Sequence, residues 1–249
     1  MRPETALQIA ASLDSPVELL PVLPRLFHGL AALGSDPTLV AGALQRAGLG
    51  PGARVIDLGC GKGAVALEVA SALAAQVDGI DAFAPLVDEA SAAAREHSLE
   101  SRCSFRVGDL RWLKGEGRYD AALWIGLGPI VGDLHETMGY VRSFVRTGGL
   151  VAIDDEYARK PLEEQERARR ALTAFGDQIL YERPTPPWET RALNAEILDI
   201  LRENARVLCA EEPAWTALAR EFLVRQKRQS RTLETNLIPC LWVLQRGDG

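Results

Sequence analysis

The sequence predicts an α/β protein with a doubly wound, mostly parallel sheet of seven strands and helices on both faces. Two observations support this fold class. From Ala53 onward, short apolar runs alternate with alanine-rich stretches of helical spacing, a pattern typical of parallel strands joined by right-handed crossover helices. The chain also has 249 residues and 47% hydrophobic content, which is enough to bury one large core.

Residues 1–50 precede the predicted sheet and have a different texture. Leu, Val and Ala recur there at helical spacing between the helix breakers Pro16, Pro21, Pro24, Gly34 and Pro37. We therefore expect residues 1–50 to form an N-terminal helical cap and residues 51–249 to form the main domain.

Five strands follow in order, with a helix after each of the first two. The helices are expected at 64–75 and 85–97, the second with Pro85 at its start. The strands are expected at 53–58 ("ARVIDL"), 76–81 ("QVDGID"), 103–107 ("CSFRV"), 119–125 ("YDAALWI") and 149–154 ("GLVAID").

The alternation weakens after Asp155. Here we expect helices at 161–176, 191–204 and 213–234, a Pro-rich loop at 183–190, a sixth strand at 206–212 ("RVLCAEE") and a final strand at 237–245. The inserted helical segments, about 158–204 and 213–234, resemble a lid. Their aromatic residues Trp188, Trp215 and Phe222 fit either a cover over an active site or packing under a long connection.

The stretch "RVIDLGCGKGAVALEVA" places a glycine-rich turn between the first strand and its helix. Open parallel sheets bind ligands beyond the carboxyl ends of their strands, where the strand order reverses. Gly59, Gly61 and Gly63 permit backbone conformations that a Cβ would block, and they expose N–H groups at the start of the helix. The turn therefore predicts a nucleotide-like ligand.

The spacing Asp57-x-Gly59-x-Gly61-x-Gly63 differs from the dinucleotide pattern G-x-G-x-x-G. It resembles the first motif of class I S-adenosylmethionine-dependent methyltransferases, D/E-x-G-x-G-x-G. Asp81 at the second strand end, Gly108-Asp109-Leu110, "YDAALWIGLGPI" and "VRTGGLVAIDD" resemble later motifs of this family, with Arg146-Thr147 where Lys-Pro is frequent. The resemblance covers residues 53–155.

The resemblance implies a Rossmann-like methyltransferase fold that binds S-adenosyl-L-methionine. The turn would pack against the amino-acid part, Asp81 would accept both ribose hydroxyls, and Asp109 would accept from the exocyclic amine of adenine. Asp57 fits equally well as a buried acid that accepts from N–H groups of the turn. The expected cofactor-binding residues are Asp57, Gly59, Cys60, Gly61, Gly63, Asp81, Ala82, Asp109, Leu110 and Ile125.

Methyl transfer from a sulfonium is an in-line displacement, so alignment in a dry pocket supplies much of the acceleration. A base is required only if the acceptor must lose a proton. Asp154 and Asp155 are candidates, because adjacent acids raise one another's pKa, although strand-end solvation explains them too. His135 is a weaker candidate, since a lone His is more often structural. Trp124 either borders the methyl donor or belongs to the core.

The inserted helices resemble those of small-molecule methyltransferases, so we expect a small-molecule acceptor. The net charge of −6 and the segment "WIGLGPI", in place of N/D-P-P-Y/F, argue against nucleic acid. The alternatives are methylation of tRNA or protein and a non-catalytic S-adenosylmethionine-binding module. The basic cluster Arg225, Lys227, Arg228 and Arg231 favours the first, but it also fits a solvated helix face.

The four cysteines, Cys60, Cys103, Cys209 and Cys240, are scattered without metal-ligand spacing. We expect reduced, mostly packed thiols and no metal site. The sequence has neither a leader-like segment nor a long uncharged apolar segment, so the expected location is the cytoplasm and no membrane partner is expected. The oligomeric state is not predicted.

Overall fold

The computed structural model describes residues 2–32 and 36–248. Contacts divide the chain into two compact units: unit 1 is Met1–Ala31 with Thr185–Ile238, and unit 2 is Ala32–Pro184 with Pro239–Gly249. This division differs from the expected boundary at residue 50. Helix α3 (Pro37–Arg46) belongs to unit 2, because its buried residues Val40, Ala41 and Leu44 join the core beneath the sheet. The expected lid segment 158–204 is likewise divided between the units at Thr185.

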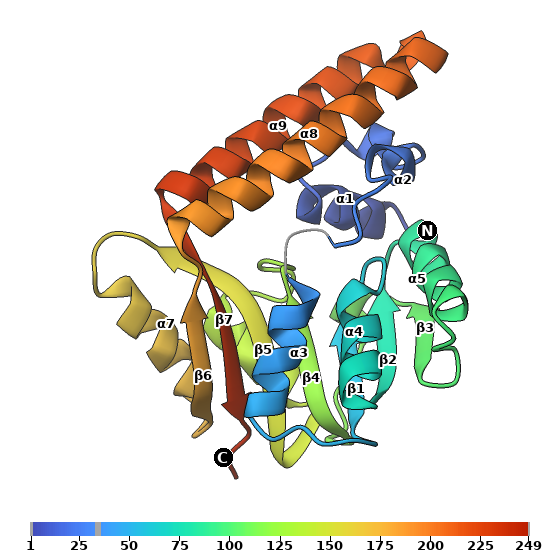
Figure 1. Ribbon diagram of the computed structural model, residues 1–249. Helices are drawn as coiled ribbons and strands as arrows, with labels where there is room; N and C mark the ends of the chain where they lie inside the picture. Colours follow the sequence, from blue (N-terminus) through green and yellow to red (C-terminus); the bar gives the residue numbers. More distant parts are fainter. Residues whose placement is uncertain (1, 33–35, 249) are drawn as a thin grey trace. The chain divides into compact units, whose positions relative to one another are not determined.

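Unit 2 is built on a seven-stranded sheet with the order β3-β2-β1-β4-β5-β7-β6 (Figure 1). Its central pairings, β2–β3, β1–β2, β1–β4 and β4–β5, are parallel, whereas β6 and β7 pair antiparallel. The predicted doubly wound sheet is therefore confirmed. The strands are β1 (Arg54–Leu58), β2 (Gln76–Asp81), β3 (Cys103–Val107), β4 (Tyr119–Ile125), β5 (Val145–Ala158), β6 (Gln178–Pro184) and β7 (Leu237–Gln245).

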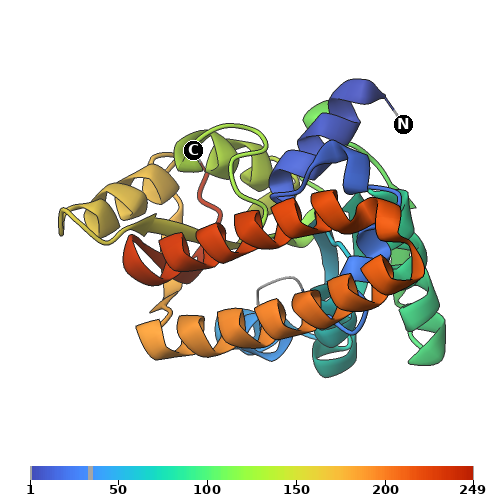
Figure 2. The ribbon, with the colours of Figure 1, turned by 90° about the horizontal axis from the view of Figure 1, so that it is seen from above.

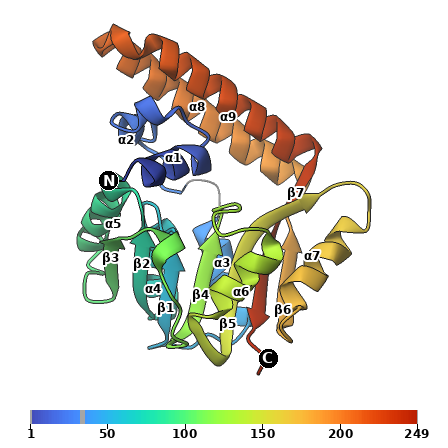
Figure 3. The same cartoon turned by 180° about the vertical axis from the view of Figure 1, so that it is seen from behind.

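Helices cover both faces of this sheet. Figures 1 and 3 show α3 and α4 (Ala64–Leu73) on one face and α6 (Leu134–Arg142) on the other. Helix α5 (Ala84–Glu96) contacts β2 and β3, and α7 (Glu164–Thr173) contacts α6 and β5. On the α3–α4 face, alternate strand residues such as Val55, Leu123 and Ala152 point into one core, as the two-residue period of a strand requires.

Unit 1 is helical and contains α1 (Pro3–Ser12), η1 (Val17–Leu19), α2 (Leu23–Leu26), α8 (Pro187–Glu211), η3 (Pro213–Trp215) and α9 (Thr216–Thr235). Helices α8 and α9 run side by side as an antiparallel hairpin (Figure 2). Phe222 of α9 is fully buried and meets Phe27 edge-on, with ring centroids 6.0 Å apart. Asn204 of α8 donates to the carbonyls of Leu26 and His28. Among the described residues, no helix combines the length and apolarity of a membrane span.

The prediction of a strand at 206–212 ("RVLCAEE") is wrong. Residues 206–211 form the last part of helix α8, which ends at Glu211. Leu201, Ala205 and Leu208 are buried at helical spacing, so packing within unit 1 decides the conformation despite the short apolar run. The sixth strand is instead β6, which follows a left-handed turn at Gly176 (φ +79°). The expected loop at 183–190 is also shorter, since β6 extends to Pro184 and α8 begins at Pro187.

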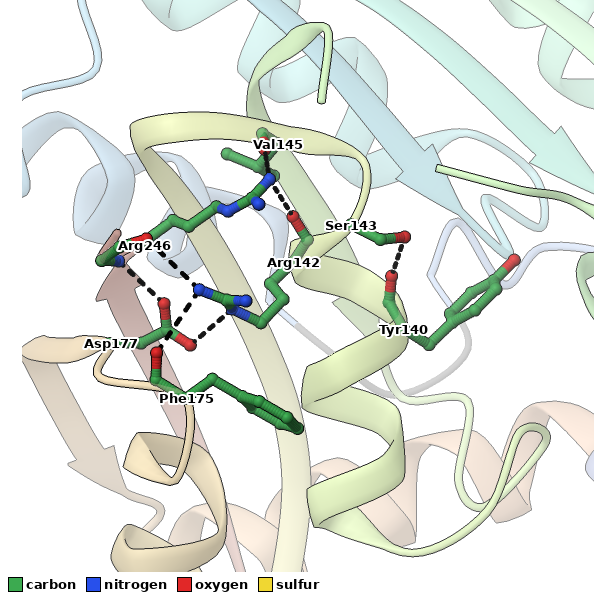
Figure 4. Close-up of polar contacts among 8 residues, drawn as sticks. Tyr140, Arg142, Ser143, Val145, Phe175, Asp177 and Arg246 are labelled. Carbon is green, nitrogen blue, oxygen red and sulfur yellow. Dashed lines mark hydrogen bonds and ion pairs between the residues drawn. The ribbon is translucent and has the colours of Figure 1, made fainter. Parts of the chain in front are cut away.

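A buried ion pair joins α6, the start of β6 and the chain end after β7 (Figure 4). Arg142 Nε donates to Asp177 Oδ2 at 2.9 Å, and the two side chains are only 9% and 0% exposed. The second carboxylate oxygen accepts from Gly247 N at 2.9 Å. The guanidinium of Arg246 donates to the carbonyls of Arg142 and Val145. These contacts hold Arg246 and Gly247 against the end of α6 and the start of β5.

We expect Arg142→Met to lower the free energy of unfolding by about 3–5 kcal/mol, because it leaves the buried Asp177 carboxylate without its counter-charge. Urea unfolding followed by circular dichroism measures this change. The matched control is Arg146→Met, which removes a 57%-exposed partner of Asp120 and should change stability by about 0–1 kcal/mol. Equal losses in the two variants would contradict a structural role for the buried pair.

Candidate functional site

The glycine-rich turn follows β1 and leads directly into α4. Its glycines have left-handed backbone conformations, with φ of +75° at Gly59, +51° at Gly61 and +79° at Gly63, a region that side chains with a Cβ rarely adopt. Space is limiting too, because a Cβ on Gly63 would lie 2.9 Å from the Phe105 ring and 3.0 Å from Ala90 Cβ. The turn therefore needs glycine for conformation and, at Gly63, for packing.

The end of β2 determines the shape of this turn. Gly59 N and Cys60 N both donate to the Ile80 carbonyl, at 2.7 and 3.0 Å. Gly61 N donates to Asp81 Oδ2 at 2.9 Å. Because β1 and β2 pair in parallel with Leu58 opposite Ile80, these partners lie next to the turn at the carboxyl edge of the sheet.

Asp81 is held between the turn and the start of the next helix. Its Oδ1 accepts from Phe83 N at 2.8 Å, while Oδ2 accepts from Gly61 N. Burial raises its pKa, and hydrogen bonds from the backbone of Phe83, Gly61 and Ala82 oppose that shift. Each carboxylate oxygen has two acceptor positions, so Asp81 can fix the turn and still accept from a ligand.

Asp57, on β1 just before the turn, is 2% exposed. Burial, together with the nearby charge of Asp81, raises its pKa to about 7. The sequence also allowed Asp57 to accept hydrogen bonds from the turn. This alternative is wrong for Gly59, Cys60 and Gly61, because their N–H groups donate to Ile80 and Asp81 instead. The causes of this shift include no hydrogen bond to the Asp57 carboxyl group. A buried acceptor in this state favours a cationic donor from a ligand.

The segment after β3 carries Asp109 and Leu110. Asp109 is engaged by Arg111, whose Nε lies 3.0 Å from Oδ1 and whose terminal nitrogen lies 2.6 Å from Oδ2. Leu110 is 4% exposed, and its carbonyl accepts from Tyr140 Oη of α6 at 2.6 Å. Burial and then the charge of Asp109 raise the pKa of Tyr140 to about 12, so this phenol remains a donor. The motif did not indicate either Arg111 or Tyr140.

The ends of β4 and β5 lie at the same edge of the sheet. Ile125 is in register with Asp154, and Gly126 N donates to the Asp154 carbonyl at 3.1 Å. The next residue, Leu127, lies against the glycine turn, because a Cβ built on Gly59 would come within 2.3 Å of its side chain. Leu127 therefore covers the turn, a role that its position in "GLGPI" did not reveal.

Three successive acids, Asp154 to Glu156, lie within the last part of β5, which extends to Ala158 and so beyond the expected strand end at residue 154. Asp154 and Asp155 are half-buried, and Glu156 is the more exposed neighbour. Burial raises the pKa of Asp155. Partial desolvation of its carboxyl group, followed by the charges of Asp155 and Asp154, raises the pKa of Glu156 to about 7. This arrangement suits proton acceptance near neutral pH, and Glu156 is a member that the sequence did not single out.

The remaining candidates are used in packing. The His135 ring stacks on Phe175, with centroids 4.7 Å apart and planes at 17°, at the contact between α6 and the end of the α7 segment. Trp124 is fully buried and meets Tyr140 edge-on at 6.0 Å. The Trp124 ring thus belongs to the core. Burial raises the pKa of the Cys60 thiol well above its usual range, which makes this thiol a poor nucleophile.

A family model described as a methyltransferase domain matches residues 49–205. The matched segment contains the turn, Asp81, Asp109 and the acids of β5, and it spans more than half of the 249 residues. The chain belongs to this methyltransferase family.

Solved structures with the same fold support the architecture of this methyltransferase. A SAM-dependent methyltransferase from Geobacter sulfurreducens, in complex with S-adenosyl-L-homocysteine, is 20% identical, with a TM-score of 0.73 over 91% of this chain and 98% of that chain. The [4+2]-cyclase SpnF is 19% identical, with a TM-score of 0.70 over 93% and 94%. Coclaurine N-methyltransferase, bound to N-methylheliamine and SAH, is 13% identical, with a TM-score of 0.67 over 99% and 90%. At these identities the likeness concerns the fold.

The raised pKa of Asp57 predicts a pH-dependent stability. Its value of about 7 in the folded protein exceeds the ordinary 3.8, so ionisation disfavours the folded state as pH rises between these values. The side chain of Asp57→Asn cannot ionise. We therefore expect the free energy of unfolding of this variant to rise relative to that of the wild type between pH 4 and pH 7, by on the order of 4 kcal/mol at most. Above pH 7 the difference should level off.

Urea unfolding at several pH values measures this difference. Asp88→Asn, at an exposed position on α5, is the matched control and should show no such trend. A constant difference between Asp57→Asn and the wild type across this range would contradict a penalised carboxylate.

Proposed function

We propose that this methyltransferase transfers a methyl group from S-adenosyl-L-methionine to a small-molecule acceptor by in-line displacement. The observation that carries the proposal is the bonding of the glycine turn to the end of β2 through Ile80 and Asp81. These hydrogen bonds hold a bent backbone at the N-terminus of α4, with the Asp81 carboxylate beside it. Such a site suits a nucleoside that carries a charged amino-acid tail.

The cofactor residues that we propose are the predicted set. Asp81 accepts from the ribose hydroxyls with the acceptor positions that the backbone bonds leave, and Ala82 lines the same strand end. Asp57 accepts, directly or through water, from the cofactor ammonium group, while Gly59, Cys60, Gly61 and Gly63 supply backbone that a ligand can approach closely. The proposal is supported by the burial of Asp57 and by its raised pKa, to which no hydrogen bond contributes.

The adenine end of the proposed site lies at Asp109, Leu110 and Ile125. Leu110 is buried beside Asp109 and supplies an apolar surface. Asp109 meets the exocyclic amine while Arg111 remains on its other side, so this carboxylate binds as part of an ion pair. The pair fixes the side-chain rotamer, and it also weakens the acceptor by sharing its charge with a guanidinium.

For proton removal from the acceptor we propose Asp154 and Asp155, supported by Glu156, whose pKa is about 7. These side chains lie on the strand in register with the end of β4. His135 is left out of the proposed chemistry because its ring is stacked on Phe175. A small acceptor is consistent with a chain of net charge −6, which has little affinity for a phosphate backbone.

We also place the reaction in the cytoplasm. The cysteines are free, and Cys60, Cys103 and Cys240 are buried. Reduced thiols of this kind are typical of a compartment that does not form disulfides.

Isothermal titration calorimetry with S-adenosyl-L-methionine and S-adenosyl-L-homocysteine tests the cofactor site. We expect both to bind, and we expect Asp81→Asn to weaken binding by about 1.5–3 kcal/mol, or roughly 10-fold to 150-fold, because it removes a charged acceptor. The control is Asp88→Asn, which lies seven positions along on the exposed side of α5 and should bind like the wild type. If Asp81→Asn binds both compounds as tightly as the wild type, the assignment of the cofactor site to the turn and Asp81 is wrong.

Methyl transfer from cofactor labelled on the methyl carbon tests the acceptor class. We expect label to enter a small-molecule fraction of a cell extract and to stay out of the RNA and protein fractions. Asp155→Asn should reduce this transfer by about 100-fold or more if a general base assists it, while cofactor binding stays unchanged. Label found only in RNA or protein would replace the proposed acceptor with a macromolecule, and cofactor binding without any transfer would favour a binding module.

A further inference from the structure

The solvent-facing side of α9 carries a row of cations around an exposed apolar residue. Arg220, Val224 and Arg228 are spaced four residues apart on one side of the helix, over about 12 Å, and Val224 is 60% exposed. Neither arginine has a salt-bridge partner in the described part of the chain, whereas Arg225 is paired with Glu221 at 2.6 Å. This row lies along an open groove of about 450 Å³, which Asp14 and Ala217 also line.

Helix α8 of the same unit has a row of the opposite charge, with acidic residues around an exposed apolar residue. Glu203, Val207 and Glu211 have the same four-residue spacing, with the glutamate side chains 60% exposed and Val207 39% exposed. The two acids form surface ion pairs with Arg206 and Arg25. Exposed pairs of this kind contribute little, so both carboxylates remain accessible to a further cation.

We propose that the α9 row of one copy docks against the α8 row of a second copy. Two helices packed along these rows place arginines at both ends against glutamates, and the two valines meet between them. The spacing matches because both rows follow the rise of an α-helix. Each copy carries both rows, so a symmetric dimer makes the contact twice.

The composition of the groove favours a protein partner over the other polyanions that arginines attract. Asp14 and Glu221 place carboxylates among the cations, which opposes a phosphate backbone or an anionic membrane surface. The single aromatic residue of α9, Phe222, is buried, so the row offers no ring for base stacking. Among protein partners, the second copy is the one whose complementary row is present in the chain itself.

Sedimentation velocity of the full chain at low salt tests this proposal. We expect a monomer–dimer equilibrium, with a dimer Kd about 100-fold higher in Arg220→Glu/Arg228→Glu and in Glu203→Arg/Glu211→Arg, because each variant sets like charges opposite each other at both contacts. A 1:1 mixture of the two variants should dimerise again. In the mixed dimer, the acidic α9 row meets the basic α8 row, and the two native rows meet as well.

The matched control for Arg220→Glu/Arg228→Glu is Arg46→Glu/Arg95→Glu, which makes the same change in net charge at exposed positions on α3 and α5 and should leave the dimer intact. Circular dichroism checks the fold of each variant, and Val224→Asp provides an independent disruption if a reversal variant does not fold. A monomeric wild type at every concentration tested would overturn the proposal. So would a dimer that neither reversal variant nor Val224→Asp weakens, or a mixture that stays monomeric.

Discussion

The hydrogen bonds between the end of β2 and the glycine turn are the constraint on which the candidate site depends. Two successive N–H groups, those of Gly59 and Cys60, share the Ile80 carbonyl. The next glycine binds the Asp81 carboxylate. The turn can close in this way only because parallel pairing sets Leu58 beside Ile80. On the other side of β2, the pairing with β3 sets Gly79 beside Phe105, and a Cβ at Gly79 would come within 2.4 Å of the Phe105 ring.

This geometry concentrates negative charge where burial penalises it. Burial raises the pKa of both Asp57 and Asp81, and the charge of Asp81 raises the pKa of Asp57 further. Backbone N–H groups partly compensate Asp81 but not Asp57. The ligand-free site is therefore destabilised by its own acids, which is typical of positions kept for binding rather than for stability. A cationic ligand at Asp57 would relieve the penalty, so binding and protonation there are linked.

The sequence was most informative where chemistry and local structure coincide. The strands up to β5 and the positions of Asp81 and Asp109 at the ends of β2 and β3 follow from periodicity and from motif spacing. The prediction failed at "RVLCAEE" because a run of so few apolar residues fits the periodicity of a strand and of a helix equally well. Burial of Ala205 and Leu208 within unit 1 makes this segment helical. The prediction also missed Arg111 and Leu127, since a motif identifies a carboxylate or a glycine but not the side chain that comes to rest against it.

The proposed donor site and the proposed acceptor site differ in how far local backbone structure determines their contacts. The bonds that shape the turn come from β1, β2 and the first residues of the helices that follow them, so a short continuous stretch of sequence is sufficient to build the proposed methyl-donor cradle. In the function that we propose, the acceptor contacts come from side chains such as those of Asp154 and Asp155 in β5, which take no part in the bonds that shape the turn. Substitutions there can change the acceptor without disturbing the cradle. A [4+2]-cyclase and a coclaurine N-methyltransferase share this fold, as expected when a fold and the chemistry of its site vary independently.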